Sequence, residues 1–329
     1  MIYNSKYIYR MIKYIFGFVF ITISSILYDK YKQKQEKIQE GKTYDLVSKY
    51  LINDVPIDSQ NIIWVHVDQD VNARKWLHWG SRNTKSLNQP YLNLTLKSII
   101  QQANGEFKVC IIDDDSFQKL IPGFSLDLRN VPEHAKTPIR TLAKLKLLHL
   151  YGGFIVPISY LALQPLSNLF YKGLESNNCF VCCSQQHTLN CMNESVDVDI
   201  SFMGARKNTK IISDIIEDLE ILYSNDFTNE KTILNKVNSI LKHYATSNTL
   251  TIIDAKNTGC TDAENKTISL DMLFSEQSIK FSNDLNGILI PYKNILKRNK
   301  YNWFSVLPEE EIIILKNNLG RYFSTSIIT

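Results

Sequence analysis

The sequence predicts an α/β fold, an open sandwich built on a mainly parallel sheet, and two observations carry this prediction. Short runs rich in β-branched and aromatic residues alternate along the chain with longer stretches whose apolar residues recur at helical spacing. The first two of these runs flank one helical stretch, which is the pattern of a β-α-β unit with a parallel strand pair. With 329 residues, 44% of them hydrophobic, the chain is long enough for one large or two moderate domains.

The predicted β-α-β unit begins at residue 61. Residues 61–67, NIIWVHV, are a β-branched and aromatic run that is typical of a strand. Residues 91–103 place Leu92, Leu96 and Ile99 at helical spacing. Residues 107–112, FKVCII, predict a second buried strand, which ends abruptly in DDDS.

The next helix is expected at residues 137–153, TPIRTLAKLKLLHLYGG. Thr137 is of a residue type that caps helix starts, and Pro138 suits a first helical turn. Gly152 or Gly153 is expected to end the helix in the left-handed conformation.

Further elements follow in the same alternation. Residues 154–156 predict a short strand, which Pro157 ends because proline cannot donate to the ladder. The CFVCC run at residues 179–183 has the spacing of a zinc or redox site, but no matching second ligand pair follows, so we interpret it as a buried strand whose cysteines are small hydrophobic residues. Amphipathic helices are expected at residues 208–223 and 231–244.

The amino-terminal residues predict a membrane anchor. Residues 11–28 hold one charge, Lys13, near their start, and a helix of this length spans about 27 Å, enough for a thin bilayer. A cleaved signal peptide and a buried core helix are the competing interpretations. The predicted organisation is a short tail at 1–10, the transmembrane anchor at 11–28, a stem at 29–60, a main domain at 61–305 and a helical tail at 306–329.

Charge and short motifs narrow the class of partner. The net charge of +4 is small, and basic residues are interleaved with acidic ones, so a nucleic-acid-binding surface is not indicated. Three N-x-[ST] sequons, at Asn93, Asn193 and Asn265, are compatible with a secretory route.

Several polar groups are candidates for a site, because ligands of such sheets bind beyond the carboxyl ends of the strands. Asp113 and Asp115 stand in D-x-D spacing after the second strand, where they either hold a cation or simply cap the turn; we favour the cap. Asp197 and Asp199 are expected on one face of a strand, either beside the cleft or exposed; we favour the exposed face. Further candidates are cations that suit phosphate: Arg140 and Lys144, four apart on one helix, and Arg82 in the Arg-, Trp- and His-rich segment 72–83. The alternatives, which we favour, are a solvated helix face for Arg140 and Lys144 and the edge of a core for the segment 72–83.

The runs VCIIDDDSF, LYGGFIVPIS and ISFMGARKNTKIISDII resemble a known family between about residues 61 and 223. This family comprises the glycosyltransferases with a DxD sugar-binding region, of the yeast initiating α-mannosyltransferase and capsular-polysaccharide-synthesis type. Its core reads approximately as D-x-x-R on a helix, then L-Y-x-x-GG-[IV]-Y-x-D-x-D. The resemblance implies a GT-A-like fold and a nucleotide-sugar donor. It also implies that the domain lies in the lumen of a secretory or Golgi-like compartment.

The departures from this pattern concern the metal. The helix aspartate and arginine of the family fall on Thr141 and Lys144, and the two metal-binding aspartates fall on Pro157 and Ser159. Proline has no side-chain oxygen and a lone serine hydroxyl is a poor ligand, so no metal is expected at these two positions. Mn²⁺ or Mg²⁺ is expected only if Asp113 and Asp115 substitute.

The resemblance therefore implies a membrane-anchored glycosyltransferase-like protein that transfers a hexose to a glycan or glycoprotein acceptor through a degenerate metal site. A non-catalytic sugar-binding or assembly protein of the same fold is the alternative. Asp197 and Asp199 are the candidate catalytic residues. The expected donor site comprises Arg82, Asp113, Asp115, Arg140, Thr141, Lys144, Gly152, Gly153, Pro157 and Ser159.

Overall fold

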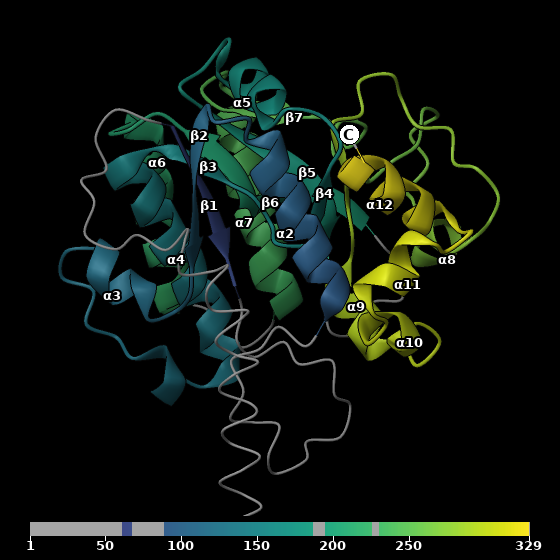
Figure 1. Ribbon diagram of the computed structural model, residues 1–329. Coiled ribbons are helices and arrows are strands. Elements are labelled where there is room, and N and C mark those ends of the chain that lie inside the picture. The colour runs from purple at the N-terminus through teal and green to yellow at the C-terminus, as the bar shows by residue number, and fades with distance from the viewer. Residues whose placement is uncertain (1–60, 68–88, 187–194, 226–229, 329) are drawn as a thin grey trace, which may run out of the picture. The chain divides into compact units, whose positions relative to one another are not determined.

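The computed structural model describes residues 61–67, 89–186, 195–225 and 230–328 (Figure 1). Within these ranges the chain has the predicted α/β architecture, built on a six-stranded sheet. The predicted tail, anchor and stem at 1–60 and the segment 72–83 lie outside the described residues. Among the residues described, no helix combines the length and the apolar character needed to cross a bilayer.

The main sheet is mixed, with a majority of parallel pairs. Its strands lie in the order β2-β1-β3-β6-β5-β7. The pairs β1–β2, β1–β3 and β5–β7 are parallel, whereas β6 is antiparallel to both of its neighbours. The mainly parallel sheet is therefore confirmed. The strands are β1 (Asn61–His66), β2 (Phe107–Ile112), β3 (Gly153–Ile155), β5 (Cys179–Gln186), β6 (Ser195–Ala205) and β7 (Thr251–Ile253).

The first β-α-β unit has the predicted form. The helix α2 (Pro90–Gln102) connects β1 to β2 and begins with a proline, whose missing N–H is one that a first turn leaves unbonded anyway. The register pairs Asn61 with Phe107 and His66 with Ile112. The carboxyl ends of β1 and β2 are therefore level, so residues that follow the two strands are brought close together.

The next helix begins earlier than predicted. α4 runs over Glu133–Tyr151, with Pro132 at its cap position. The expected cap at Thr137 and first-turn proline at Pro138 were wrong, because Pro138 lies inside the helix. Proline lacks the N–H that would bond one turn back, a loss that a helix tolerates best close to its start. The predicted end was right, since Gly152 follows α4 with a φ of +71°.

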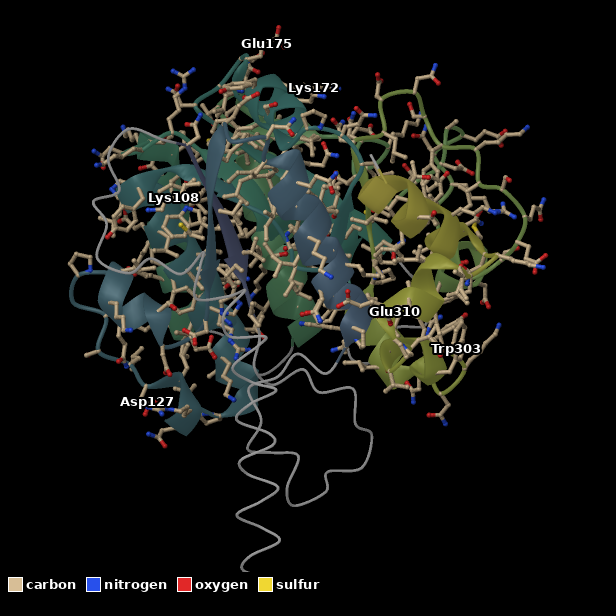
Figure 2. All side chains as sticks on the ribbon, in the orientation of Figure 1. Lys108, Asp127, Lys172, Glu175, Trp303 and Glu310 are labelled. Carbon is tan, nitrogen blue, oxygen red and sulfur yellow. The ribbon has the colours of Figure 1, made fainter. Side chains whose placement is uncertain are left out.

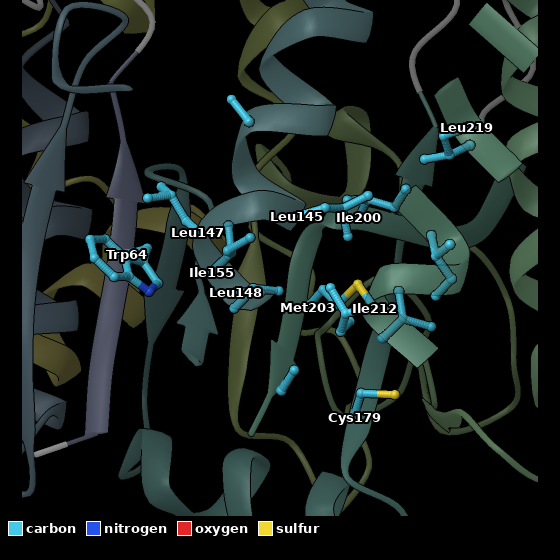
Figure 3. Packing of buried hydrophobic residues seen from close by; sticks show 14 of the residues in the cluster. Trp64, Leu145, Leu147, Leu148, Ile155, Cys179, Ile200, Met203, Ile212 and Leu219 are labelled. Carbon is cyan, nitrogen blue, oxygen red and sulfur yellow. The ribbon is translucent and has the colours of Figure 1, made fainter. Parts of the chain in front are cut away.

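Helices cover both faces of the sheet. α4, α6 (Lys210–Asn225) and α7 (Glu230–Thr246) pack over one face, and α5 (Leu166–Leu174) packs over the other. Phe154 contacts Phe170 of α5, whereas Ile155 joins the core under α4, because successive strand residues point to opposite faces. Figure 3 shows part of the core under α4: Trp64, Ile155, Ile200 and Met203 from the sheet, Leu145, Leu147 and Leu148 from α4, and Ile212 and Leu219 from α6.

The carboxyl-terminal part of the chain packs beside α2. β4 (Tyr160–Ala162) and β8 (Gly287–Leu289) form a small antiparallel sheet, which contacts α2 and α12 (Asn318–Ile328). The predicted helical tail is helical, and it buries Leu319 and Phe323. Trp303 and Glu310 lie on the outside of this region (Figure 2). The short helices of the fold are α3 (Ser116–Leu120), a 3-10 helix (Leu128–Asn130), α8 (Leu270–Leu273), α9 (Tyr292–Lys297), α10 (Asn302–Ser305) and α11 (Glu309–Ile313).

The CFVCC run forms the first part of β5. Cys179 and Cys182 are buried and Cys183 is half-buried, which confirms the interpretation as a buried strand. All three are free thiols, and burial raises the pKa of Cys179 to about 12. These thiols therefore stay protonated at neutral pH and contribute as apolar side chains.

Candidate functional site

The carboxyl ends of the parallel strands gather at one edge of the main sheet. β1 and β2 end at the register partners His66 and Ile112. β3 is parallel to β1, and after Ile155 it leads into the turn at residues 157–159. β6 runs in the opposite direction, so its first half, which contains Asp199, extends past the end of β3 alongside β5. Most of the predicted site residues therefore lie along this carboxyl edge.

A buried network of three charged or titratable side chains lies at this edge. Asp114, which follows β2, accepts hydrogen bonds from Nε and Nη2 of Arg140 at 2.9 and 2.6 Å. Nε2 of His66, at the end of β1, lies 3.0 Å from Oδ1 of Asp114, and the His66 ring stacks on Phe117 at 5.3 Å between centroids. The three polar side chains are 6–13% exposed. β1, β2 and α4 are thus joined by one polar cluster.

The charge state of this network follows from its geometry. Burial alone would raise the pKa of Asp114, but the hydrogen bonds from His66 and Arg140 and the charge of Arg140 outweigh burial and hold that pKa well below its usual range. Asp114 is therefore an ionised carboxylate that can only accept hydrogen bonds. It follows that Nε2 of His66 carries a hydrogen atom and donates a hydrogen bond to Oδ1 of Asp114.

The network changes the expected role of Arg140. The sequence left two roles open for Arg140, a solvated helix face or a cation that meets a phosphate, but Arg140 is buried and places two of its nitrogen atoms on Asp114. Sequence reasoning placed Asp114 beyond the strand ends, with its two neighbouring aspartates, but gave it no partner, and it did not single out His66. The parallel pairing of β1 and β2 was the signal that could have found them, because it brings the residues after both strands together.

Among the described residues, Asp113 and Asp115 are not grouped with a third side chain that could hold a metal ion. Oδ1 of Asp113 accepts hydrogen bonds from the backbone nitrogen and the hydroxyl of Ser116 at 2.9 and 2.6 Å, so Asp113 closes the turn into α3. The favoured interpretation of a turn cap is thus confirmed for Asp113. Asp115 occupies the cap position of α3 without a side-chain cap bond. In the part of the chain that the structure describes, no three His, Cys, Asp or Glu side chains are grouped to hold a metal ion.

Gly152 and Gly153 have structural reasons to be glycine. Both have positive φ angles, and a Cβ at Gly153 would lie 2.3 Å from the carbonyl oxygen of Ile62. The indole nitrogen of Trp64 donates to the carbonyl of Gly152 at 2.9 Å. The two glycines therefore let the link from α4 to β3 lie directly against β1. They lie at the start of β3, away from the carboxyl edge.

The turn that replaces DxD is held from two sides. Thr95 of α2 donates its hydroxyl to the carbonyl of Ile158 at 2.6 Å, and the backbone nitrogen of Ile290 donates to the carbonyl of Ser159 at 3.1 Å. Ser159 is buried, while Pro157 is half-buried at the end of β3. The turn keeps its place at the carboxyl edge without offering a carboxylate.

Asp197 and Asp199 lie on the same face of the β5–β6 hairpin, as predicted. Their register partners are Ser184 and Cys182, which are two residues apart on β5. Asp199 accepts hydrogen bonds from the hydroxyl of Ser184 at 2.7 Å and from the backbone nitrogen of Ser201 at 2.8 Å. Asp197 instead pairs with Lys242 at 2.8 Å. Both aspartates are half-buried, so the favoured interpretation of an exposed strand face was wrong.

Two further predicted donor residues, Thr141 and Lys144, lie on α4 away from the edge. α4 begins near the carboxyl edge and runs away from it toward the start of β3. Lys144 is one turn farther from the edge than Arg140, about 6 Å along the helix. Thr141 donates to the carbonyl of Thr137 and also bonds the Tyr223 hydroxyl of α6. Arg82 lies outside the described residues.

Comparisons of the chain with protein-family models, with curated proteins and with solved structures find no match. The resemblance to glycosyltransferases therefore stays a prediction. What the described residues establish is an α/β fold whose carboxyl edge carries a buried ionic network, a hydrogen-bonded carboxylate and a fixed turn.

Proposed function

We propose that this protein is a membrane-anchored glycosyltransferase-like protein, which transfers a hexose from a nucleotide sugar to a glycan or glycoprotein acceptor without a DxD metal. The observation that supports it best is the position of Asp114, Asp199 and the turn 157–159 along the carboxyl edge, where α/β sheets bind their ligands. We propose in addition that residues 11–28 anchor the chain and that the domain lies in the lumen of a secretory compartment.

The donor diphosphate needs a cation other than Arg140 in this proposal. Lys136 stands one turn before Arg140 on the same side of α4, closer to the carboxyl edge, and is half-buried. A lysine there would offset the charge that develops on the diphosphate as it leaves, which is the role that a metal has in the family. Lys144 points along the same face but stands two turns farther from the edge.

Asp199 is the proposed catalytic carboxylate. Ser184 and the Ser201 backbone fix its two oxygens, and a carboxylate has about four acceptor positions, so it can still accept a bond from an acceptor hydroxyl. A carboxylate in this role orients the hydroxyl and takes its proton as the bond to the sugar forms. Asp197 is less suited, because Lys242 already pairs with it.

A non-catalytic sugar-binding or assembly protein is the second candidate, and two observations favour it. Arg140 is neutralised by Asp114, and Ser159 is buried, so two groups of the expected donor site are not presented to a ligand. A protein that keeps the fold but not the chemistry would retain such structural contacts.

Nucleotide-sugar binding tests the proposal. We expect UDP-glucose, UDP-galactose or GDP-mannose to bind the full-length protein in detergent, measured by calorimetry, with Mn²⁺ and equally with chelator. Lys136→Ala should weaken binding about tenfold or more, as expected for loss of one charge-assisted phosphate contact. Lys144→Ala is the matched control on the same helix face and should bind as the wild type does. Binding that disappears with chelator would instead support a cation at Asp113 and Asp115. No binding of any donor would reject the proposal and leave the second candidate.

Transfer activity tests the role of Asp199. Asp199→Asn keeps the size of the side chain but removes the proton acceptor, so we expect the transfer rate to fall by about 10²-fold or more while donor binding is retained. Asp197→Asn, two residues away on the same face, should keep most of the activity. Equal losses in both variants, or loss of donor binding in Asp199→Asn, would assign the effect to folding rather than to proton transfer.

A further inference from the structure

Three sequons occur in the chain, and the structure shows that two of them have different surroundings. Asn93 lies in α2, and Asn265 lies in the loop between β7 and α8. The third, Asn193, is outside the described residues. An asparagine can carry a glycan in the folded protein only where the surface around it leaves room for one.

Asn265 lies at the tip of an exposed, tightly held loop. Residues 263–266 are all exposed, and Asn265 has a φ of +66°, a turn conformation that asparagine adopts more easily than most residues. Oδ1 of Asp262 accepts from the backbone nitrogens of Glu264 and Lys266, both at 2.9 Å. A bridge between Thr261 and Thr267 closes the base of the loop. The asparagine side chain is thus presented to solvent on a fixed turn.

The sequon at Asn93 has the opposite environment. Its threonine, Thr95, is fully buried and donates its hydroxyl to the carbonyl of Ile158 in the turn 157–159. Leu92 and Leu94, on either side of Asn93, are buried as well. Asn93 itself is half-buried, on a helix that packs against β4, so the surface around it is far more confined than the surface around the exposed Asn265.

We propose that Asn265 is a site of N-linked glycosylation and that Asn93 is not. In this reaction Nδ2 of Asn265 forms a bond to the anomeric carbon of a lipid-linked oligosaccharide. The bond from that carbon to the lipid diphosphate breaks, the diphosphate leaves with the bonding electrons, and the amide nitrogen loses one proton to solvent. The site rests on the proposed lumenal location of the domain and is independent of whether the protein transfers sugars.

Translation of the full-length chain in the presence of microsomal membranes tests the site. The readout is a mobility shift that endoglycosidase treatment removes, measured in an Asn193→Gln background so that only two sequons remain. We expect one glycan in this background, no glycan after Asn265→Gln, and one glycan after Asn93→Gln. A glycan that persists in Asn265→Gln overturns the assignment.

A pair of substitutions at one position controls for folding. Thr267→Ala removes the sequon and should abolish the shift, whereas Thr267→Ser preserves the sequon and should keep it. A chain without any glycan also overturns the proposal, and an added sequon at the carboxyl terminus identifies the reason. If the added sequon is modified, the domain is lumenal and Asn265 is not an acceptor. If it is unmodified, the lumenal location is wrong. The binding and transfer experiments described above then still decide whether the protein binds and transfers a sugar.

Discussion

Replacing Arg140 by leucine is expected to destabilise the protein by about 3–5 kcal/mol, because it leaves the ionised Asp114 buried without its main partner. Urea unfolding followed by circular dichroism measures this change. Arg129→Leu is the matched control, since Arg129 also bonds an aspartate, Asp127, through two nitrogens, but on the exposed surface. The control should unfold almost as the wild type does. If both variants lose a similar free energy of unfolding, the burial of the Arg140–Asp114 pair is not the cause of the destabilisation.

The same pair gives the expected pH dependence. The pKa of Asp114 is lower in the folded protein than in the unfolded chain, so its contribution is complete above the unfolded value of about 4 and is lost as the pH falls below it. We therefore expect the stability difference between the wild type and Arg140→Leu to be constant from pH 5 to 7 and to shrink below about pH 4. A difference that grows on acidification would contradict an ionised Asp114.

Gly153→Ala is expected to have the second large effect, a loss of about 2–5 kcal/mol in the free energy of unfolding. Alanine is strained at the φ of +102°, and its Cβ would lie 2.3 Å from the carbonyl oxygen of Ile62 in the neighbouring strand. β3 would have to move away from β1, and the contacts of the central sheet would be lost.

Gly123→Ala separates the two causes of this loss. Gly123 also has a positive φ, +78°, but a Cβ there has no heavy atom within 4 Å. Its variant should therefore lose only the conformational part, about 1 kcal/mol. Thermal unfolding of both variants checks the expectation. If Gly153→Ala and Gly123→Ala lower the melting temperature equally, the close approach of β3 to Ile62 does not contribute to the loss of stability.

Much of the fold was predictable because it depends on local patterns. The first β-α-β unit followed from β-branched runs on either side of one helical stretch, and the glycine end of α4 followed from glycine chemistry. The start of α4 was missed, since Thr137 and Pro138 are good starting residues and nothing local shows that the helix continues through them. The position of β6 between β3 and β5 was missed because strand order depends on contacts between distant residues.

The site was predictable only in part for the same reason. The cap at Asp113 and the shared face of Asp197 and Asp199 follow from short-range geometry, and both were found. The three consecutive aspartates look alike in the sequence, so nothing local shows that Asp114 is the one that bonds His66 and Arg140. A buried pair of this kind depends on β1, β2 and α4 coming together, which the sequence pattern does not specify.

The place of β6 has a consequence for how the chain folds as it is synthesised. β1, β2 and β3 are made in succession and can pair at once, but the next neighbour of β3 is β6, and β5 is made before it. The edges of β3 and β5 that β6 later covers are therefore unpaired on the ribosome until residues 195–205 emerge. Unpaired strand edges invite association with other chains. A chaperone that shields these edges during translation should therefore raise the yield of folded protein more than one added after synthesis is complete.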